Sequence, residues 1–321
     1  MKKLVNNNWV TNSFTDCLIK LAKKNKKIVV LDADLSDDVN LKKFEKKYPK
    51  RFIQNGIAEQ DMVSMAGGIA LTGLVPVVNS FASFLTARAN EQIYNNATEL
   101  TKIIYMNLYA GILPAGAGKS HQSLRDIALL ASIPNIKIYH PYNSIETREI
   151  LKYCVNNNQK ENSAIRLSIG PPPENSPNLP DNYLFQAGTG SVLTEGEDCI
   201  LFTYGQTMVN EAFKTYKHLK SNNINLKIIN MPCINQFKKN WLKNVIGQIK
   251  HIFFLEDHNI NGGLSDLMSS FFMENSICKN KSVYKFGVKN FPACGTPAEV
   301  LKHHGLDYLK ISSTIKNILN K

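Results

Sequence analysis

The acidic residue Glu59 stands just after a glycine turn, at the point where an amphipathic helix begins. It belongs to the run Arg51-Phe52-Ile53-Gln54-Asn55-Gly56-Ile57-Ala58-Glu59-Gln60. Further along, an apolar stretch leads into Asn79-Ser80-Phe81-Ala82-Ser83-Phe84-Leu85, which places two aromatic rings at the end of a predicted strand. A carboxylic acid can hydrogen-bond a ring nitrogen, and an aromatic side chain can stack on the ring. We therefore expect Glu59 and these rings to bind a flat heteroaromatic cofactor.

Each of these residues also has a plainer interpretation when it is taken alone. Glu59 could stabilise the macrodipole of the helix that it opens, and Phe81 and Phe84 could be ordinary core residues. His121 follows a loop rich in glycine and alanine, and a single histidine caps a helix or packs in a core about as readily as it takes part in catalysis. The same loop contains Gly118-Lys119-Ser120, but it is not a phosphate-binding loop, because Leu113 replaces the required first glycine.

The elements that must position these side chains alternate between strand and helix. Strands are predicted at residues 28–31, 75–78, 103–108, 136–139 and 164–167, and helices at 10–21, 62–70, 86–97, 124–131 and 145–155. This order predicts an α/β domain whose parallel sheet is covered by helices on both faces. Such sheets bind ligands at the carboxyl ends of their strands. The loops to consider are therefore 32–36, 55–59, 79–84 and 109–122, all in the first predicted domain.

A proline-rich stretch separates this domain from a second one. Five prolines lie between Gly170 and Gly188, which predicts an extended and fairly stiff linker. The alternation then restarts, with strands predicted at 199–204, 226–229, 252–255 and 283–288 and with helices between and after them. The predicted organisation is a first α/β domain at residues 1–170, a linker at 171–188 and a smaller α/β domain at 189–321.

The composition is that of a globular protein, with 43% hydrophobic residues. No stretch approaches the roughly 20 apolar residues that a membrane span needs, and residues 1–8 contain no apolar core of a signal peptide. The six cysteines form no C-x-x-C pair, which predicts reduced, mostly buried thiols. The net charge of +12 includes many lysines on the polar face and at the end of the first helix, which favours a solvated surface over a nucleic-acid site. We expect a cytoplasmic protein with neither nucleic acid nor membrane as a partner.

Four motifs together carry a family resemblance. In chain order they are R-F-x-x-x-G-I-A-E-Q, S-F-A-S-F-L-x-x-R-A-x-E-Q-I, S-H-Q-S-L-R-D-I-A and I-P-N-I-K-I-Y-H-P. The series resembles the C-terminal half of transketolase, and is similar also to that half of deoxyxylulose-phosphate synthase. The resemblance extends from about Trp9 to the end of the chain, with weaker second-domain matches at Gly196 to Gly205 and Glu256 to Gly263. It implies a pyrimidine-binding domain of the thiamine diphosphate-binding fold, followed by a transketolase C-terminal domain.

The resemblance also implies roles for individual residues. The acid at Glu59 would hydrogen-bond N1′ of the aminopyrimidine of thiamine diphosphate, which favours the imino form of the 4′-amino group that deprotonates thiazolium C2. Phe84 would stack on the pyrimidine with Phe81 alongside, Asp34 would lie near the cofactor, and His121 would face the substrate. Glu59 and His121 are thus the candidate catalytic residues. The implied reaction transfers a two-carbon ketol unit from a ketose to an aldose, with the cofactor as electron sink.

The other half of the cofactor site is missing from the sequence. Thiamine diphosphate enzymes anchor the diphosphate and Mg²⁺ through a G-D-G segment, and this chain contains none. Because the resemblance begins close to Met1, we expect a split transketolase whose diphosphate-binding, N-terminal subunit is a separate polypeptide. The expected assembly is α2β2. We predict no metal-ligand set in this chain, with Mg²⁺ held mainly by the partner.

Three positions at the substrate end depart from the family pattern. Ala117 replaces an acid, Tyr109 replaces a histidine, and Ile169 replaces an arginine that binds the sugar phosphate. Loss of a charge-assisted phosphate contact weakens recognition by about 1.5 to 3 kcal/mol. We therefore expect a sugar or sugar phosphate other than the usual pentose and hexose phosphates, such as a modified or nucleotide-linked sugar.

Two alternative functions stay open at this point. The β subunit of a 2-oxo-acid dehydrogenase E1 component has the same two domains, although the stretch from Ser80 to Ile93 and the pair His121-Gln122 fit transketolase better. The second alternative, a catalytically silent subunit that keeps the fold, gives no reason to retain Glu59.

Overall fold

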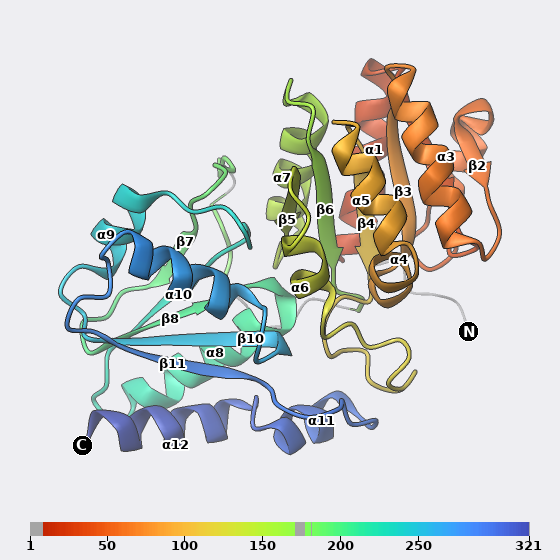
Figure 1. Ribbon diagram of the computed structural model, residues 1–321. Coiled ribbons are helices and arrows are strands. Elements are labelled where there is room, and N and C mark those ends of the chain that lie inside the picture. The colour runs from red at the N-terminus through yellow and green to blue at the C-terminus, as the bar shows by residue number, and fades with distance from the viewer. Residues whose placement is uncertain (1–8, 171–176, 181, 321) are drawn as a thin grey trace. The chain divides into compact units, whose positions relative to one another are not determined.

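The computed structural model describes residues 9–170, 177–180 and 182–320. The chain divides into two compact units, one of residues 1–110, 129–172 and 179–185 and one of residues 111–128, 173–178 and 186–321. The stretch 1–8, considered above for a signal peptide, and residues 171–176 and 181 of the predicted linker lie outside the described residues. Each unit is an α/β sandwich built on its own sheet (Figure 1).

The first unit contains a six-stranded sheet in the order β2-β1-β3-β4-β6-β5. Its strands are β1 (Ile28–Asp32), β2 (Phe52–Gln54), β3 (Val75–Phe81), β4 (Ile104–Leu108), β5 (Ile136–Tyr139) and β6 (Asn162–Leu167). Every pair of neighbours is parallel. All residues of β1, β3, β4 and β6 are buried, as expected when helices cover both faces of a parallel sheet. The predicted fold class is confirmed.

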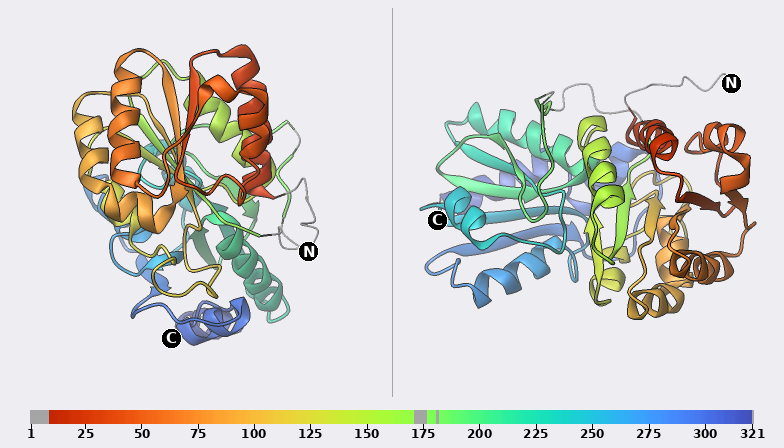
Figure 2. Two further views of the ribbon diagram at one scale, coloured as in Figure 1. Left: turned by 90° about the vertical axis from the view of Figure 1, so that its right-hand side faces the viewer. Right: turned by 90° about the horizontal axis from the view of Figure 1, so that it is seen from above.

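Two groups of helices cover this sheet. Figure 2 shows α1 (Val10–Lys24) and α7 (Ser144–Asn156) packed together on one face, with α3 (Glu59–Leu71), α4 (Ala82–Arg88) and α5 (Asn90–Thr98) on the other. The shorter elements are α2 (Lys42–Lys47), a 3-10 turn at Pro49–Arg51 and α6 (Asp126–Ala131). In α1 the apolar residues Val10, Phe14 and Leu18 are fully buried, because spacings of four residues place them on one helical face.

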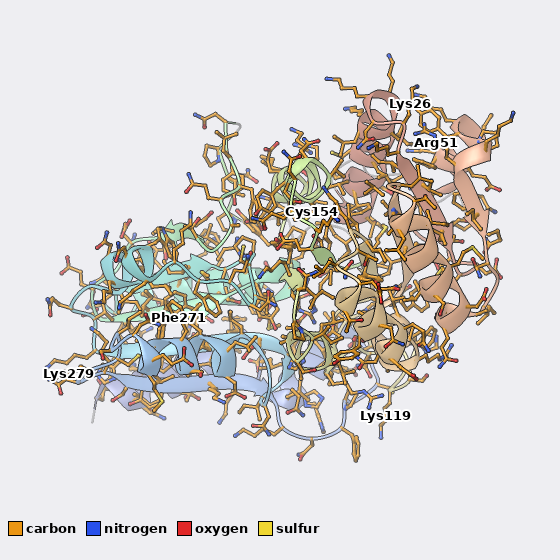
Figure 3. The ribbon with its side chains drawn as sticks, turned by 45° about the horizontal axis from the view of Figure 1, so that its top comes forward. Lys26, Arg51, Lys119, Cys154, Phe271 and Lys279 are labelled. Atoms are coloured by element: carbon orange, nitrogen blue, oxygen red, sulfur yellow. The ribbon has the colours of Figure 1, made fainter. Side chains whose placement is uncertain are left out.

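Arg51, the first residue of the Glu59 motif, has a structural role. Its guanidinium donates hydrogen bonds to the backbone oxygens of Ala22 (3.1 Å) and Asn25 (3.2 Å) at the end of α1. Figure 3 shows its side chain near Lys26 at the same end of the first unit. A cation at a helix C-terminus satisfies carbonyls that have no partner within the helix and interacts favourably with the helix dipole. Arg51 therefore fixes α1 against the strand that precedes Glu59.

The second unit contains a five-stranded sheet in the order β11-β10-β8-β9-β7. Its strands are β7 (Ser191–Thr194), β8 (Cys199–Thr203), β9 (Leu226–Asn230), β10 (His251–Asn259) and β11 (Ser282–Val288). The sheet is mixed, because β7 runs antiparallel to β9 while the other pairs are parallel. The helices are α8 (Gly205–Lys220), α9 (Lys239–Ile246), α10 (Leu264–Glu274), α11 (Pro297–His304) and α12 (Tyr308–Leu319).

The second-domain motif from Glu256 to Gly263 anchors α10. The buried Glu256 carboxylate accepts hydrogen bonds from the backbone N–H groups of Leu264 (2.6 Å) and Ser265 (3.0 Å), in the first turn of that helix. A β-carbon at Gly263 would lie 2.2 Å from the same carboxylate, so only glycine permits this approach. The motif is therefore explained by the fold of the second unit.

Several elements differ from the sequence-based predictions. The strand predicted to end at Val78 extends to Phe81, and a helix break at Ala89 divides the predicted 86–97 helix into α4 and α5. Short elements that carry little periodicity, such as β2 and β7, were not predicted. Residues 111–128 pack with the second unit although they belong to the first domain by sequence order. In the part of the chain that the structure describes, no helix has both the length and the apolar character of a membrane span.

Candidate active site

Glu59 is the first residue of α3 and lies at the carboxyl edge of the first sheet. The chain reaches it from β2 through Gly56, whose φ of +66° is a left-handed conformation that glycine adopts without strain. A side chain at Gly56 would meet nothing within 4 Å, so the turn geometry alone explains this glycine. Glu59 is only 4% exposed, whereas the preceding Ile57 is 74% exposed. The turn thus directs one carboxylate inward at the edge where parallel sheets bind ligands.

Three aromatic rings lie together at the same edge. The rings of Phe81 and Phe84 have centroids 5.5 Å apart, and those of Phe81 and Tyr109 are 4.5 Å apart. Phe81 ends β3, Phe84 lies in the first turn of α4 and Tyr109 follows β4. Phe81 is buried, while Phe84 is half-buried. The two predicted rings, Phe81 and Phe84, therefore lie together, and the ring of Tyr109, which follows the next strand of the sheet, lies against Phe81.

Tyr109 adopts a backbone conformation that is unusual for a residue other than glycine. Its φ is +54°, and non-glycine residues in this region are uncommon and concentrate at functional sites. Burial raises the pKa of the Tyr109 phenol, and the negative charge of Asp38 raises it further. Since a phenol with an ordinary pKa is already protonated at neutral pH, the Tyr109 hydroxyl is protonated there and can donate a hydrogen bond.

Arg88 connects the acid to the rings. Its Nη1 donates to both carboxylate oxygens of Glu59, at 3.1 and 3.3 Å. Its Cζ lies 4.0 Å from the centroid of the Phe84 ring, an arrangement typical of a cation–π contact. Arg88 lies in the second motif, but it is not among the residues predicted above to bind the cofactor or to act in catalysis. The available signal was its position four residues after Phe84, since such residues meet on one helical face.

Asp34 occupies the loop after β1. It is exposed, with a φ of +61°, and its backbone N–H donates to the side-chain oxygen of Gln54 at 3.0 Å. The buried Asp32 shapes this loop, because its carboxylate accepts from the backbone N–H groups of Leu35 and Ser36, each at 3.1 Å. The structure therefore leaves the Asp34 carboxylate available at the carboxyl edge, and its role as a cofactor neighbour stays a prediction.

His121 lies on the loop 111–128, which belongs to the second unit. This loop is closed by paired backbone hydrogen bonds between Gly111 and Ser123. The Gln122 amide donates to the backbone oxygens of Ile112 (2.9 Å) and Ala293 (3.0 Å). His121 itself is half-buried, with Nδ1 3.0 Å from the Ser120 hydroxyl. The loop holds the imidazole at its surface, and the predicted catalytic role of His121 stays a prediction.

The site of the first unit has the chemistry that an aminopyrimidine requires. A buried carboxylate can hold a ring nitrogen through a hydrogen bond, and the neighbouring Phe84 ring provides a stacking surface. Glu59, Phe81 and Phe84 therefore fit the pyrimidine end of thiamine diphosphate. Among the described residues, no group of three or more His, Cys, Asp or Glu side chains could hold a metal ion.

The first unit is thus an α/β domain that places a buried acid and three aromatic rings at the carboxyl edge of a parallel sheet. Residues 9–170 match the family model of the transketolase pyrimidine-binding domain, and residues 188–311 match that of the transketolase C-terminal domain. The chain therefore belongs to the transketolase family, whose members are transferases.

Similar proteins fall into two groups by length. The chain is 31% identical over 313 residues to a transketolase C-terminal section from Methanocaldococcus jannaschii, covering 96% of this chain and 95% of that protein. It is 30% identical to one subunit of the apulose-4-phosphate transketolase of Actinobacillus succinogenes, covering 93% and 94% of the two chains. By contrast, it spans 49% of the human transketolase, at 29% identity over 96% of this chain.

A solved structure described as a split-gene transketolase, inactive beta4 tetramer, has the same fold. It superposes with a TM-score of 0.84 at 27% identity, covering 97% of this chain and 98% of the other. The family resemblance expected from the four motifs is thus confirmed by both sequence and structure.

Proposed function

We propose that this chain is the pyrimidine-binding subunit of a two-subunit transketolase that depends on thiamine diphosphate. The reaction would move a two-carbon ketol unit from a ketose donor to an aldose acceptor. The observation that carries the proposal is the Glu59 carboxylate, which is 4% exposed at the carboxyl edge of the sheet and is linked to the Phe84 ring through Arg88. Family membership supports the reaction type.

In this proposal each side chain at the edge has a defined task. Glu59 holds the proton at N1′ of the aminopyrimidine, Phe84 stacks on the ring, and Phe81 supports Phe84. By the family resemblance, Asp34 would lie beside the cofactor, and His121 of the second unit would face the sugar. When bound, thiamine diphosphate supplies the nucleophilic carbon and the electron sink for ketol transfer. Burial of Glu59 strengthens its hydrogen bond to the ring nitrogen, because competing water is excluded.

A separate diphosphate-binding subunit would complete the site. The chain has no G-D-G segment, and two relatives of nearly equal length are named as one subunit of a transketolase and as a split-gene product. We infer that the partner holds the diphosphate and most of the Mg²⁺ coordination, and that the active assembly is α2β2. A mass of the purified mixture that corresponds to two copies of each chain would support this stoichiometry.

The substrate is inferred to be a sugar or sugar phosphate outside the usual pentose and hexose set. Tyr109, Ala117 and Ile169 replace charged or imidazole side chains of the ordinary family pattern. The name of the Actinobacillus succinogenes relative refers to apulose 4-phosphate, which supports an unusual sugar in this branch. Efficient turnover of xylulose 5-phosphate by the reconstituted pair would count against this inference.

We also infer a cytoplasmic location. Four of the six cysteines are buried, and cysteines kept as thiols rather than disulfides are typical of a reducing compartment. Cell fractionation with an antibody against the chain tests this inference.

The deciding experiment is a calorimetric titration of thiamine diphosphate with Mg²⁺. The titrant is added to this chain alone and to its mixture with the candidate subunit that carries G-D-G. We expect binding in the mixture only, and strongly weakened binding with Glu59→Gln, which cannot hold the N1′ proton as a carboxylic acid does. A mixture that co-purifies but does not bind the cofactor would favour the silent-subunit alternative instead.

A further inference from the structure

The guanidinium of Arg88 contacts the two groups that the proposed function assigns to the cofactor ring. One nitrogen, Nη1, lies within 3.3 Å of both oxygens of the Glu59 carboxylate. The central carbon lies 4.0 Å from the centroid of the Phe84 ring. The acid and the ring that would hold the pyrimidine are therefore joined by one planar, positively charged group.

A guanidinium and an N1′-protonated aminopyrimidine share the properties that this site recognises. Both are flat, both present N–H donors in their plane, and both carry delocalised positive charge. Both can donate to a carboxylate and lie over an aromatic ring at the same time. Arg88 thus makes, within the chain, the contacts that the cofactor ring would make.

The cofactor ring and the Arg88 guanidinium would compete for one approach to Glu59. A single Arg88 nitrogen contacts both carboxylate oxygens, and the Glu59 side chain is only 5% exposed, so a second planar donor would reach these oxygens along the side that the guanidinium covers. The Arg88 side chain, by contrast, is 49% exposed. Arg88 can therefore turn outward into water, whereas Glu59 is held by its burial at the start of α3.

We propose that Arg88 is a displaceable stand-in for the aminopyrimidine, which occupies the acid and the ring in the free subunit and leaves them when the cofactor binds. This inference rests on the proposed function. In the free subunit, this contact gives the buried Glu59 carboxylate a charged partner. It also means that cofactor binding must break an ion pair and a cation–π contact, so Arg88 opposes binding.

The test is the affinity of the reconstituted pair for thiamine diphosphate with Mg²⁺, measured by calorimetry. Arg88→Ala removes the competitor, and we expect roughly 5- to 20-fold tighter binding, from the usual strengths of a half-exposed ion pair and a cation–π contact. Arg88→Lys keeps the charge but loses the flat surface, so its affinity should fall between that of the wild type and that of Arg88→Ala. Arg125→Ala, at an exposed arginine of the second unit, serves as the matched control and should bind like the wild type.

A crystal structure of the loaded complex provides a second readout that does not depend on the stability of a variant. We expect the Arg88 guanidinium to lie away from the Glu59 carboxylate once the cofactor is bound. Weaker or unchanged affinity in both Arg88 variants, or an intact Arg88–Glu59 contact in the loaded complex, would overturn the inference. Absence of binding in the wild type and in every variant would instead be a failure of the proposed function, on which this inference depends.

Discussion

Gln54 joins the loop that carries Asp34 to the turn that carries Glu59, through its contact with Asp32. Its side-chain N–H donates to the Asp32 carboxylate at 2.9 Å, and the two residues are also cross-strand partners in the β1–β2 pair. Its side-chain oxygen accepts from the backbone N–H groups of Asp34 (3.0 Å) and Gly56 (3.1 Å). One amide therefore holds two of the candidate cofactor-binding loops in register.

Gln54→Leu should loosen both loops, because it removes three hydrogen bonds at once. Since Gln54 is exposed, water can satisfy the freed backbone N–H groups, and the buried Asp32 carboxylate keeps the hydrogen bonds from Leu35 and Ser36. We therefore expect the free energy of unfolding to fall by only about 1 kcal/mol. Cofactor affinity of the reconstituted pair should fall more, by about 10-fold, because the loops are no longer preorganised. Gln60→Leu, on the exposed side of α3, is the matched control. Equal affinities of both variants would show that Gln54 has no part in ordering the site.

Phe84→Leu tests the stacking surface. Leucine keeps an apolar side chain but has no aromatic face, and an aromatic pair contributes about 0.5 to 1.5 kcal/mol beyond buried area. We expect the affinity of the pair for thiamine diphosphate to fall by about 3- to 10-fold, as measured by calorimetry. Phe271→Leu, at a half-buried phenylalanine of the second unit (Figure 3), should leave the affinity unchanged. If both variants bind alike, Phe84 does not stack on the cofactor.

Tyr109→His tests the inferred change of substrate. Histidine is the residue of the ordinary family pattern at this position, so the variant should turn over xylulose 5-phosphate better relative to the native substrate. The quantity to compare is the ratio of the two kcat/KM values. Tyr109→Phe keeps the ring contact with Phe81, so it should retain cofactor affinity and lose only what the hydroxyl contributes to the sugar. An unchanged ratio in Tyr109→His would mean that residues other than Tyr109 determine the substrate specificity.

His140 makes the stability of the first unit depend on pH. Its ring is fully buried, with Nδ1 2.8 Å from the Arg166 guanidinium and Nε2 3.2 Å from the Ser168 hydroxyl. Burial lowers the pKa of His140 well below its usual range, and the positive charge of Arg166 lowers it further. Below about pH 6.5 the unfolded chain binds a proton at His140 that the folded chain does not bind. The contribution of His140 to the free energy of unfolding is therefore fully present at neutral pH and is lost as the pH falls.

His140 alone contributes a slope of the free energy of unfolding against pH that approaches about 1.4 kcal/mol per pH unit. Urea unfolding at several pH values between 7 and 5 should show it, and His140→Gln should reduce it while lowering stability at pH 7. His218→Gln, at an exposed histidine of α8, should keep the wild-type slope. A slope that His140→Gln leaves unchanged would mean that another group titrates.

Much of the fold was predictable from local patterns. Strand and helix alternation predicted the α/β class and most elements of the first sheet, because fully buried strands and amphipathic helices each leave a periodic trace in the sequence. The elements that were missed are short. β2 has three residues and β7 has four, too few for a period to appear.

The chemistry of the edge was predictable only in part. The types and order of Glu59, Phe81 and Phe84 by themselves indicated an acid and rings for a planar ligand, and the motifs around them indicated the transketolase family. Their roles toward the cofactor, like those of Asp34 and His121, stay predictions that the experiments above address.

The tertiary structure alone decided which side chains meet. Glu59 and Arg88 are 29 positions apart, Asp32 and Gln54 are 22 apart, and Gln122 reaches Ala293 across 171 positions. Such contacts depend on strand order and loop packing, which periodicity does not encode. For the same reason the sequence placed loop 111–128 with the first domain, whereas its hydrogen bonds and apolar side chains pack it with the second unit. Residue types thus determined the available chemistry, and the parallel sheet determined which of these groups act together.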